Sequence, residues 1–240
     1  MKVIINGANG HMGRLCVQAF ENAGHEVVAK ADVTGEGVYR SLFDYDGSAD
    51  VIVDFSFHTS AKDVCAYATE RRIPAVIATT GHTDEEKAMI SRAAESVPIF
   101  YSGNMSIGIA VLIESAKKAA SVFPDADVEI MEIHHNRKVD APSGTALMLA
   151  EAVGSVREGA EIVTGRSGSK KRNKNEIGVA SLRLANVVGI HEIYISTPYE
   201  TITLKHEAHD RGLFAQGAVK AAEFIVLKPA GLYDIKSMKL

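Results

Sequence analysis

Over the first hundred residues, short apolar runs rich in β-branched side chains alternate with segments whose apolar residues recur every three or four positions. The short runs predict strands, and the longer periodic segments predict helices. Strands that alternate with helices are typical of βαβ units around a parallel sheet. The predicted strands are 2–5, 26–31, 51–55, 75–78 and 99–101, and the predicted helices are 13–23, 60–71 and 83–96.

The pattern changes after about Gly103, where the second half of the chain indicates an α+β unit. Its later strand-like stretches are dense in Val, Ile and Thr and alternate partially, as antiparallel strands covered on one face do. We therefore expect an α/β protein with a doubly wound parallel sheet and a smaller α+β part that holds a mostly antiparallel or mixed sheet. The elements expected in this half are helices over 106–123, from 144 and over 213–227, and strands over 128–134, 179–184, 191–196 and 201–206.

A glycine-rich turn, Gly7 to Gly13, follows the first predicted strand and opens the first predicted helix. Glycines at this place let backbone N–H groups approach a pyrophosphate, whose charge is favoured at a helix N-terminus. Asp32 ends the second predicted strand, where a carboxylate can accept hydrogen bonds from ribose hydroxyls. Ordinary strand-to-helix turns also need glycine, but the context favours a Rossmann-type dinucleotide site.

Two further turns, 78–81 and 102–105, end the fourth and fifth predicted strands. Ligands of open parallel sheets collect at the carboxyl ends of the strands, so these turns are candidates to face the cofactor. The alternative is turn chemistry alone, because Thr, Gly and Asn are common in turns.

Cofactor choice depends on the residues around Asp32. Val33 follows it, so no arginine is adjacent to hold a 2′-phosphate, and Arg40 and Lys30 are more distant candidates. We expect NADH preference or use of both NADH and NADPH.

The densest chemistry lies within 132–145. His134 and His135 can exchange protons near neutral pH, and both reach one pocket only if the chain leaves the sheet at about this point. Lys138 offers a positive charge to a carboxylate, or a proton to a developing anion. A lone histidine is usually structural, but this cluster is hard to explain by packing.

Ser143 can cap the helix that follows it, which leaves the N–H groups of Gly144 and Thr145 at a helix start. A helix N-terminus favours anions, so Lys138 and this helix start together would suit a dicarboxylate. The other histidines have no comparable company and are interpreted as structural or surface positions: His11, His25, His58, His82, His191, His206 and His209.

The segment HHNRKVDAPSGTA, 134–146, resembles the HHxxKxDAPSGTA motif of the dihydrodipicolinate reductases. The resemblance extends along nearly the whole chain through the GxxGxM turn and further matching segments. These are DFS at 54–56, TTG at 79–81, GNMSIG at 103–108, VVGIHE at 187–192 and GLYD at 231–234.

The resemblance implies that His134 is the catalytic proton donor or acceptor and Lys138 the second proton donor. It implies substrate contacts from His135, Gly144 and Thr145. A hydride would pass from NADH or NADPH to the cyclic dicarboxylate made by dihydrodipicolinate synthase, which loses water to give tetrahydrodipicolinate in lysine and diaminopimelate synthesis. The implied cofactor-binding residues are Gly7, Ala8, Asn9, Gly10, His11, Met12, Asp32, Ala78, Thr79, Thr80, Ser102, Gly103, Asn104 and Met105.

The resemblance also implies a discontinuous dinucleotide-binding domain, 1–104 with 211–240, and a substrate-binding and oligomerisation domain, 105–210. Family members are commonly homotetramers paired through the sheet of the second domain. The chain departs from the family at His11 and Val33, where arginine is frequent, and is somewhat short. A different two-domain dehydrogenase, or a dinucleotide sensor without activity, would not need the whole set of residues at 134–145.

Composition excludes several other classes of protein. A net charge of −4 and a pI near 6.1 argue against a nucleic-acid partner. Cys16 and Cys65 lie apart from any metal-ligand pattern, so we expect buried thiols and no metal. The N-terminus lacks signal-peptide features, and Pro98 and Gly103 interrupt the uncharged run at 96–113, so we expect a cytoplasmic protein without a membrane partner.

A basic loop, defined as residues 165–175, carries five positive charges and no apolar residue after its first glycine. It fits a solvated flexible loop. A mobile basic lid over an acidic substrate, or an oligomer contact, is the alternative.

Overall fold

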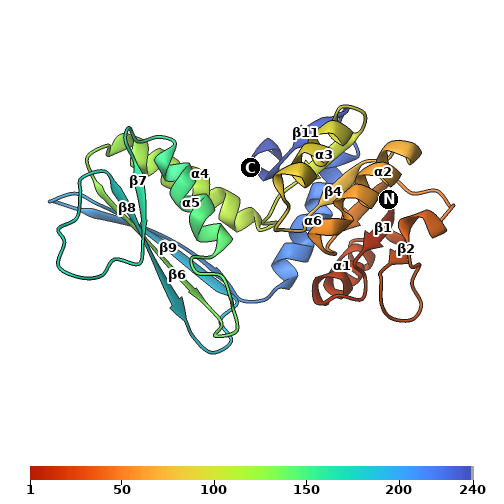
Figure 1. The fold of residues 1–240 in the computed structure, drawn as a ribbon, viewed down its shortest axis with the longest axis horizontal. Coiled ribbons are helices and arrows are strands. Elements are labelled where there is room, and N and C mark those ends of the chain that lie inside the picture. Colours follow the sequence, from red (N-terminus) through yellow and green to blue (C-terminus); the bar gives the residue numbers. More distant parts are fainter. Residues whose placement is uncertain (239–240) are drawn as a thin grey trace. The chain divides into compact units, whose positions relative to one another are not determined.

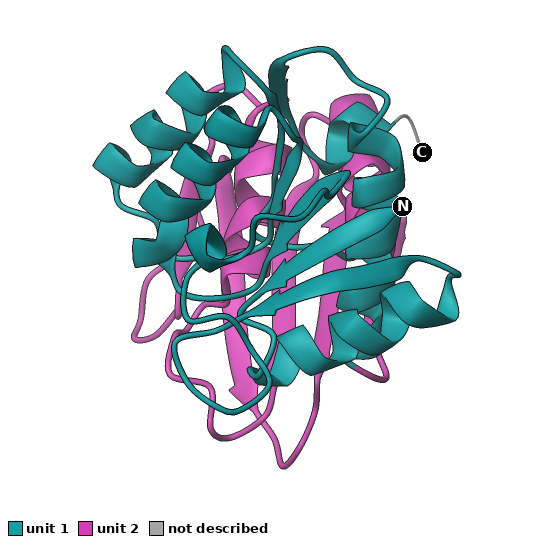
Figure 2. Cartoon of the chain, turned by 90° about the vertical axis from the view of Figure 1, so that its right-hand side faces the viewer, with its two compact units in different colours: residues 1–106, 211–240 teal, residues 107–210 magenta. Residues whose placement is uncertain are grey.

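The computed structural model describes residues 1–238. The chain forms two compact units (Figure 2). Unit 1 comprises residues 1–106 and the segment that begins at Arg211, and unit 2 comprises residues 107–210. Unit 1 is therefore built from two separate stretches of the chain.

Unit 1 contains a six-stranded sheet in the order β11-β5-β4-β3-β1-β2, in which every pair of neighbouring strands is parallel (Figure 1). The predicted alternation of strands and helices is confirmed, whereas β11 was missed because three residues give no periodicity. The strands are β1 Lys2–Asn6, β2 Glu26–Ala31, β3 Val51–Asp54, β4 Ala75–Ile77, β5 Pro98–Tyr101 and β11 Gly231–Tyr233. The helices are α1 His11–Asn22, α2 Ala61–Arg71, α3 Asp84–Ala94 and α6 Gly212–Ile225, with short 3-10 turns at Leu42–Asp44, His58–Ser60 and Ile235–Met238.

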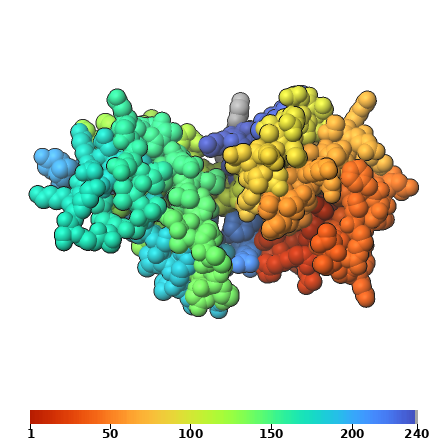
Figure 3. All heavy atoms as spheres, viewed as in Figure 1, coloured from red at the N-terminus to blue at the C-terminus, as the bar shows by residue number. Residues whose placement is uncertain are grey.

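Helices cover both faces of this sheet, which explains why its strands are continuous apolar runs. Helix α1 packs with α6, and α2 packs with α3. Buried Ile4, Ile52 and Ile77 of the strands belong to one core with residues of α2 and α3, whose outer surfaces are visible in orange and yellow in Figure 3. The strands are therefore buried between two helical layers.

The strand order changes direction at β1. From β1 the chain passes to β2 on one side, and it then returns to β3 on the other side of β1. At such a switch point the segments that follow the strands diverge, and the carboxyl edge of the sheet leaves a crevice for ligands.

Unit 2 contains a five-stranded sheet in the order β10-β9-β6-β8-β7. Strand β9 is antiparallel to β6 and β10, but β8 is parallel to both β6 and β7. The expectation of a mostly antiparallel or mixed sheet is confirmed, and the sheet is mixed. The antiparallel direction expected for β8 was wrong, because alternation reveals a covered face and not a strand's direction. The elements are α4 Ile107–Val122, β6 Asp127–His134, α5 Gly144–Gly154, β7 Glu161–Thr164, β8 Glu176–Arg183, β9 Gly189–Ser196 and β10 Thr201–Ala208.

Helices α4 and α5 cover one face of this sheet, where Val128, Ile130 and Ile193 share a core with both helices. The opposite face carries partly exposed apolar side chains. Ile133 is paired with Ile190 across β6 and β9 and with Leu182 across β6 and β8, and Leu182 is 37% exposed. No helix within residues 1–238 is both long and apolar enough to cross a membrane.

The basic loop is bound to acidic residues of its own unit. The Arg172 guanidinium donates to Asp127 Oδ1 at 2.7 Å and to Glu129 Oε1 at 3.2 Å, both on β6. Arg166 pairs with Glu176 at the start of β8. Both arginines of the loop are therefore paired with carboxylates, so it is not simply a solvated loop.

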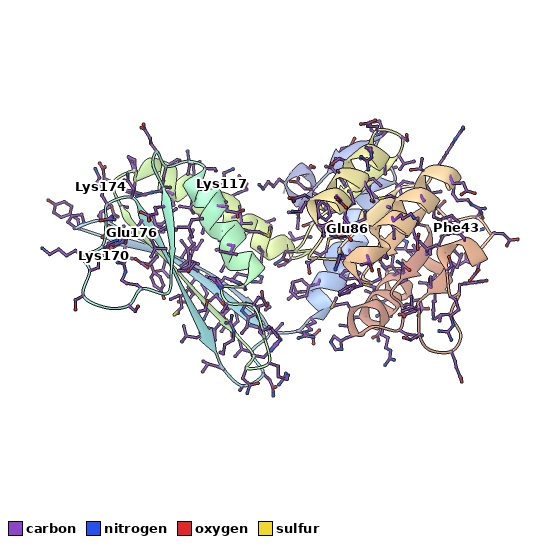
Figure 4. All side chains as sticks on the ribbon, in the orientation of Figure 1. Phe43, Glu86, Lys117, Lys170, Lys174 and Glu176 are labelled. Carbon is purple, nitrogen blue, oxygen red and sulfur yellow. The ribbon has the colours of Figure 1, made fainter. Side chains whose placement is uncertain are left out.

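The position of these contacts also bears on the lid hypothesis. Asp127 begins β6 and His134 ends it, so at about 3.3 Å per residue the two lie roughly 23 Å apart. Figure 4 labels Lys170 and Lys174 of the loop, and Lys174 pairs with Asp125 at 2.7 Å. The loop is therefore anchored at the end of β6 opposite to His134, which argues against a lid over His134 of the same chain.

Candidate active site

The glycine-rich turn of unit 1 requires glycine at two positions. Gly7 has φ +80°, and a Cβ there would lie 2.7 Å from the Phe55 carbonyl oxygen. A Cβ on Gly13 would lie 2.0 Å from the Gly7 carbonyl oxygen, closer than any real contact. The turn therefore packs backbone against backbone.

Several N–H groups of this turn already have protein acceptors. Those of Gly7 and Ala8 donate to the Ala31 carbonyl at 2.8 and 3.1 Å, and that of Asn9 donates to Asp32 Oδ2 at 2.9 Å. The first turn of α1, which begins at His11, presents the N–H groups that have no acceptor within the helix. An anion bound at this turn would therefore lie at the start of α1.

A cavity of about 600 Å³ lies at the switch point of the sheet in unit 1. Gly7, Gly10 and Asp32 line it, as does Arg40, whose guanidinium donates to the Val33 carbonyl at 2.9 Å. The segment 55–60, which follows β3, forms the opposite wall. Of the predicted cofactor residues, Gly7, Gly10 and Asp32 line this cavity. The others do not; they are Ala8, Asn9, His11, Met12, Ala78, Thr79, Thr80, Ser102, Gly103, Asn104 and Met105.

Asp54 connects three strand ends beside this cavity and has no exposed surface. Its carboxylate accepts from Asn6 Nδ2 at 2.8 Å, Ser56 Oγ at 2.5 Å and Thr79 Oγ1 at 2.7 Å. The ends of β1, β3 and β4 are thus joined through one buried carboxylate. The sequence indicated Asp54 only as part of a matching motif and assigned it no contact.

In unit 2, β6 ends at His134 and a turn follows. Strand alternation places Val128, Ile130, Glu132 and His134 on the face that the helices cover, where all four are buried. Glu132 Oε2 lies 2.5 Å from Nδ1 of His134. A buried carboxylate and a histidine are therefore in direct contact at the end of a core strand.

Arg183, at the end of β8, binds both oxygens of Glu132. Its Nη1 donates to Oε2 at 2.9 Å and its Nη2 to Oε1 at 2.8 Å, while the Ser143 N–H donates to Oε1 at 3.2 Å. Burial alone would raise the pKa of Glu132, but hydrogen bonds from His134 and Arg183 outweigh it and lower the pKa to about 2. Glu132 is therefore ionised throughout the neutral range.

His191 on β9 completes this cluster. Its ring lies edge-on to that of His134, with centroids 5.2 Å apart, and its Nε2 lies 3.2 Å from Ser143 Oγ. Burial, and then the charge of His134, lower the pKa of His191 to about 3. The interpretation that His191 has no neighbouring groups of this kind was wrong, because its neighbours His134 and Ser143 lie on β6 and at the start of α5.

Ser143 caps α5 as predicted, with its Oγ accepting from the Ala146 N–H at 3.2 Å. Gly144 begins the helix, and a Cβ there would have no atom within 4 Å, so this helix start faces open space. Thr145 follows in the first turn of the helix. The helix start is therefore open at the position of Gly144.

The segment between β6 and α5 carries the remaining predicted residues. The N–H of Lys138 donates to the His135 carbonyl at 3.1 Å, which closes a turn. Lys138 Nζ lies 2.7 Å from Asp140 Oδ1. Burial raises the pKa of Asp140, but the hydrogen bond and charge of Lys138 prevail and lower it. Lys138 therefore has an ionised carboxylate partner.

Two family profiles together match nearly the whole chain. "Dihydrodipicolinate reductase, N-terminus" matches residues 1–105, and "Dihydrodipicolinate reductase, C-terminus" matches residues 108–238. The chain belongs to the dihydrodipicolinate reductase family.

Curated relatives cover the same length. The 4-hydroxy-tetrahydrodipicolinate reductase of Caldanaerobacter subterraneus subsp. tengcongensis is 43% identical over 99% of this chain and 98% of its own. That of Clostridium tetani is 40% identical over 99% and 96% of the two chains.

Among solved structures, the dipicolinate-bound dihydrodipicolinate reductase from Paenisporosarcina sp. TG-14 is similar, with a TM-score of 0.77 and 25% identity, over 98% of this chain and 97% of its own. A probable dehydrogenase from Thermotoga maritima shares the fold, with a TM-score of 0.68 and 10% identity, over 100% of this chain and 92% of its own. The family assignment and the fold therefore agree along the chain.

Proposed function

We propose that this member of the dihydrodipicolinate reductase family reduces 4-hydroxy-tetrahydrodipicolinate to tetrahydrodipicolinate with NADH or NADPH. The observation that carries the proposal is the Glu132–His134 pair, buried at the end of β6 on the segment that leads to Lys138 and α5. Its support from outside the chain is the 43% identity to a reductase of that name.

The overall reaction adds a hydride and a proton to the substrate ring and removes one water molecule. A bound reduced nicotinamide supplies the hydride. His134 supplies or accepts a proton at its ring, and Lys138 is the second proton donor. His134 is the last residue of β6 and Lys138 lies before the start of α5, so the two groups needed for acid-assisted reduction are close in the chain.

The substrate carries two carboxylates, and the same segment offers groups that favour anions. Lys138 provides a positive charge, and the start of α5, which is open at Gly144, favours an anion at Gly144 and Thr145. With His135 as a further contact, these residues would hold the dicarboxylate beside His134. Aromatic or aliphatic substrates without carboxylates would gain nothing from this arrangement.

For the cofactor, the cavity in unit 1 has the features that a dinucleotide requires. Its glycine turn lets a ligand approach the backbone at the start of α1, and Asp32 lies where ribose hydroxyls bind. Arg40 lines the same cavity and offers a cation for a 2′-phosphate. We expect NADH preference or dual use, and a strong preference for NADPH in the Michaelis constants would contradict this.

The open face of the unit 2 sheet suits an oligomer contact. Ile133, Ile190 and Leu182 are cross-strand neighbours there, and a partly exposed apolar sheet face is typical of a surface that another chain covers. We propose that the chain forms homotetramers through this face. Light scattering should give the mass of four chains, and Ile133→Asp should lower it.

The direct test couples the purified chain to dihydrodipicolinate synthase, which forms the substrate, and follows NADH or NADPH absorbance. We expect oxidation of at least one cofactor that depends on the synthase product. Oxidation of neither cofactor, with the synthase shown to be active, would refute the proposed function.

A further inference from the structure

We infer that Glu132 is a positioning residue that fixes His134 in the tautomer with its hydrogen on Nδ1, so that Nε2 is the atom that exchanges a proton with the substrate. This inference rests on the proposed function for the role of His134. It adds a residue and an atom to which the sequence analysis assigned no role.

The charge state of Glu132 determines the tautomer. Its carboxylate is fully buried and ionised, and an ionised carboxylate can only accept hydrogen bonds. His134 Nδ1 lies 2.5 Å from Oε2, so Nδ1 must carry the hydrogen and donate it. The other ring nitrogen then holds the lone pair in the neutral form and the exchangeable proton in the cationic form.

The surroundings of Nε2 are consistent with this role. Among the described residues, Nε2 of His134 forms no hydrogen bond. It is also not a buried atom left without a partner, unlike Nδ1 of His191. Position 189 on the neighbouring strand is glycine, and a Cβ there would lie 3.1 Å from Nε2. Glycine therefore leaves the space beside Nε2 clear, while Nδ1 is covered.

Glu132 itself is held by several hydrogen-bond donors. Arg183 donates to both oxygens, and Ser143 donates its N–H to Oε1. The Ser181 side chain also lowers the pKa of Glu132 through a hydrogen bond, so the carboxylate is held as an acceptor, and its Oε2 contacts His134 Nδ1. Arg183 thus balances the buried charge and sets the direction in which the carboxylate meets the ring.

Replacement of Glu132 by glutamine has a defined consequence. One oxygen becomes an NH2 group. At the Oε1 position it would face Arg183 Nη2 and the Ser143 N–H, and at the Oε2 position it would face Arg183 Nη1 and the ring of His134. A backbone N–H cannot become an acceptor, but a neutral histidine can, by moving its hydrogen to the other nitrogen. The amide nitrogen should therefore occupy the Oε2 position and convert His134 to the Nε2–H tautomer, which cannot accept a proton at Nε2.

The experiment compares wild type, Glu132→Gln and Glu132→Asp in the coupled assay and by nitrogen NMR of histidine-labelled protein, with His134→Gln used to assign the His134 signals. Glu129→Gln is the matched control, since Glu129 is a carboxylate on the same strand that binds Arg172 and lies on the other face of the sheet. We expect Glu132→Gln to lower kcat about 100- to 10,000-fold, the range of general acid–base catalysis, with substrate and cofactor KM nearly unchanged. Glu129→Gln should change neither constant.

The spectra test the inference without any activity. Neutral His134 should be the Nδ1–H tautomer in the wild type and the Nε2–H tautomer in Glu132→Gln. An Nε2–H tautomer in the folded wild type would overturn the inference, even if Glu132→Gln fails to fold. An unchanged kcat in folded Glu132→Gln would overturn it as well. Absence of reductase activity in the wild type, with the expected tautomer present, would count against the proposed function only.

Discussion

Replacement of Ser143 by alanine should destabilise unit 2 more than the loss of an ordinary helix cap. Ser143 is 2% exposed, and its Oγ serves two partners, the Ala146 N–H and Nε2 of His191. Alanine removes both contacts at once. Nδ1 of His191 is already buried without a hydrogen-bond partner among the described residues, so the variant leaves the whole ring unsatisfied.

The magnitude follows from these two contacts. Loss of a serine N-cap costs about 1 kcal/mol. An unsatisfied buried polar group costs a further 1–3 kcal/mol or so. Ser143→Ala should therefore lower the local free energy of unfolding by about 2–4 kcal/mol, the sum of these two ranges.

Thr83→Ala provides the control. Thr83 caps α3 with its Oγ1 accepting from the Glu86 N–H, and this hydrogen bond is exposed. Water can replace it, so the expected loss is about 1 kcal/mol.

Hydrogen exchange measured by mass spectrometry gives local free energies for peptides of α5 and α3 in the two variants. The loss in α5 of Ser143→Ala should exceed the loss in α3 of Thr83→Ala by about 1–3 kcal/mol. Equal losses would mean that the contact between Ser143 and His191 adds nothing, and the reasoning would be refuted.

Two further predictions concern pH and the glycine turn. In the folded protein the pKa of His191 is lowered to about 3 from its ordinary 6.5, and that of Glu132 to about 2 from 4.5. Both groups bind a proton more readily in the unfolded chain, so acid favours unfolding. The contribution of His191 to stability is complete above pH 6.5 and declines as pH falls toward 3. The contribution of Glu132 declines below pH 4.5. Urea titrations of the wild type should give a lower free energy of unfolding at pH 5 than at pH 7, and this difference should be smaller in His191→Gln. The same pH dependence in both proteins would contradict the lowered pKa of His191. Gly13→Ala, whose Cβ would meet the Gly7 carbonyl, should destabilise unit 1 by about 1–3 kcal/mol, whereas Gly144→Ala, with open space around its Cβ, should not destabilise unit 2, and calorimetry can compare them.

The sequence predicted most helices and strands because their apolar periodicity depends on local spacing. Strand direction in unit 2 was not predictable in this way, since β8 alternates like an antiparallel strand but pairs with β6 in parallel. The three-residue strand β11 gave no pattern at all. Directions and short strands are determined by distant partners.

The candidate site likewise contains residues that the sequence could indicate and residues that it could not. His134, Lys138 and Gly144 could be named because they lie within one short segment. Arg183 and His191 come from β8 and β9, and only the sheet brings them to His134.

Glu132 did carry a local signal. It occupies a buried register position of β6, two residues before His134, among apolar side chains. A charged residue in such a position requires a buried partner, and this rule would have pointed to the pair.

The most direct test of the account follows deuterium from a cofactor labelled at its transferable hydrogen into the product, which mass spectrometry identifies. We predict that the wild type forms tetrahydrodipicolinate with one deuterium for each cofactor oxidised, and that His134→Gln forms the same product with a much lower kcat and a similar KM. Absence of deuterium from the product, with either labelled cofactor, would contradict the central claim that this chain reduces 4-hydroxy-tetrahydrodipicolinate by hydride transfer.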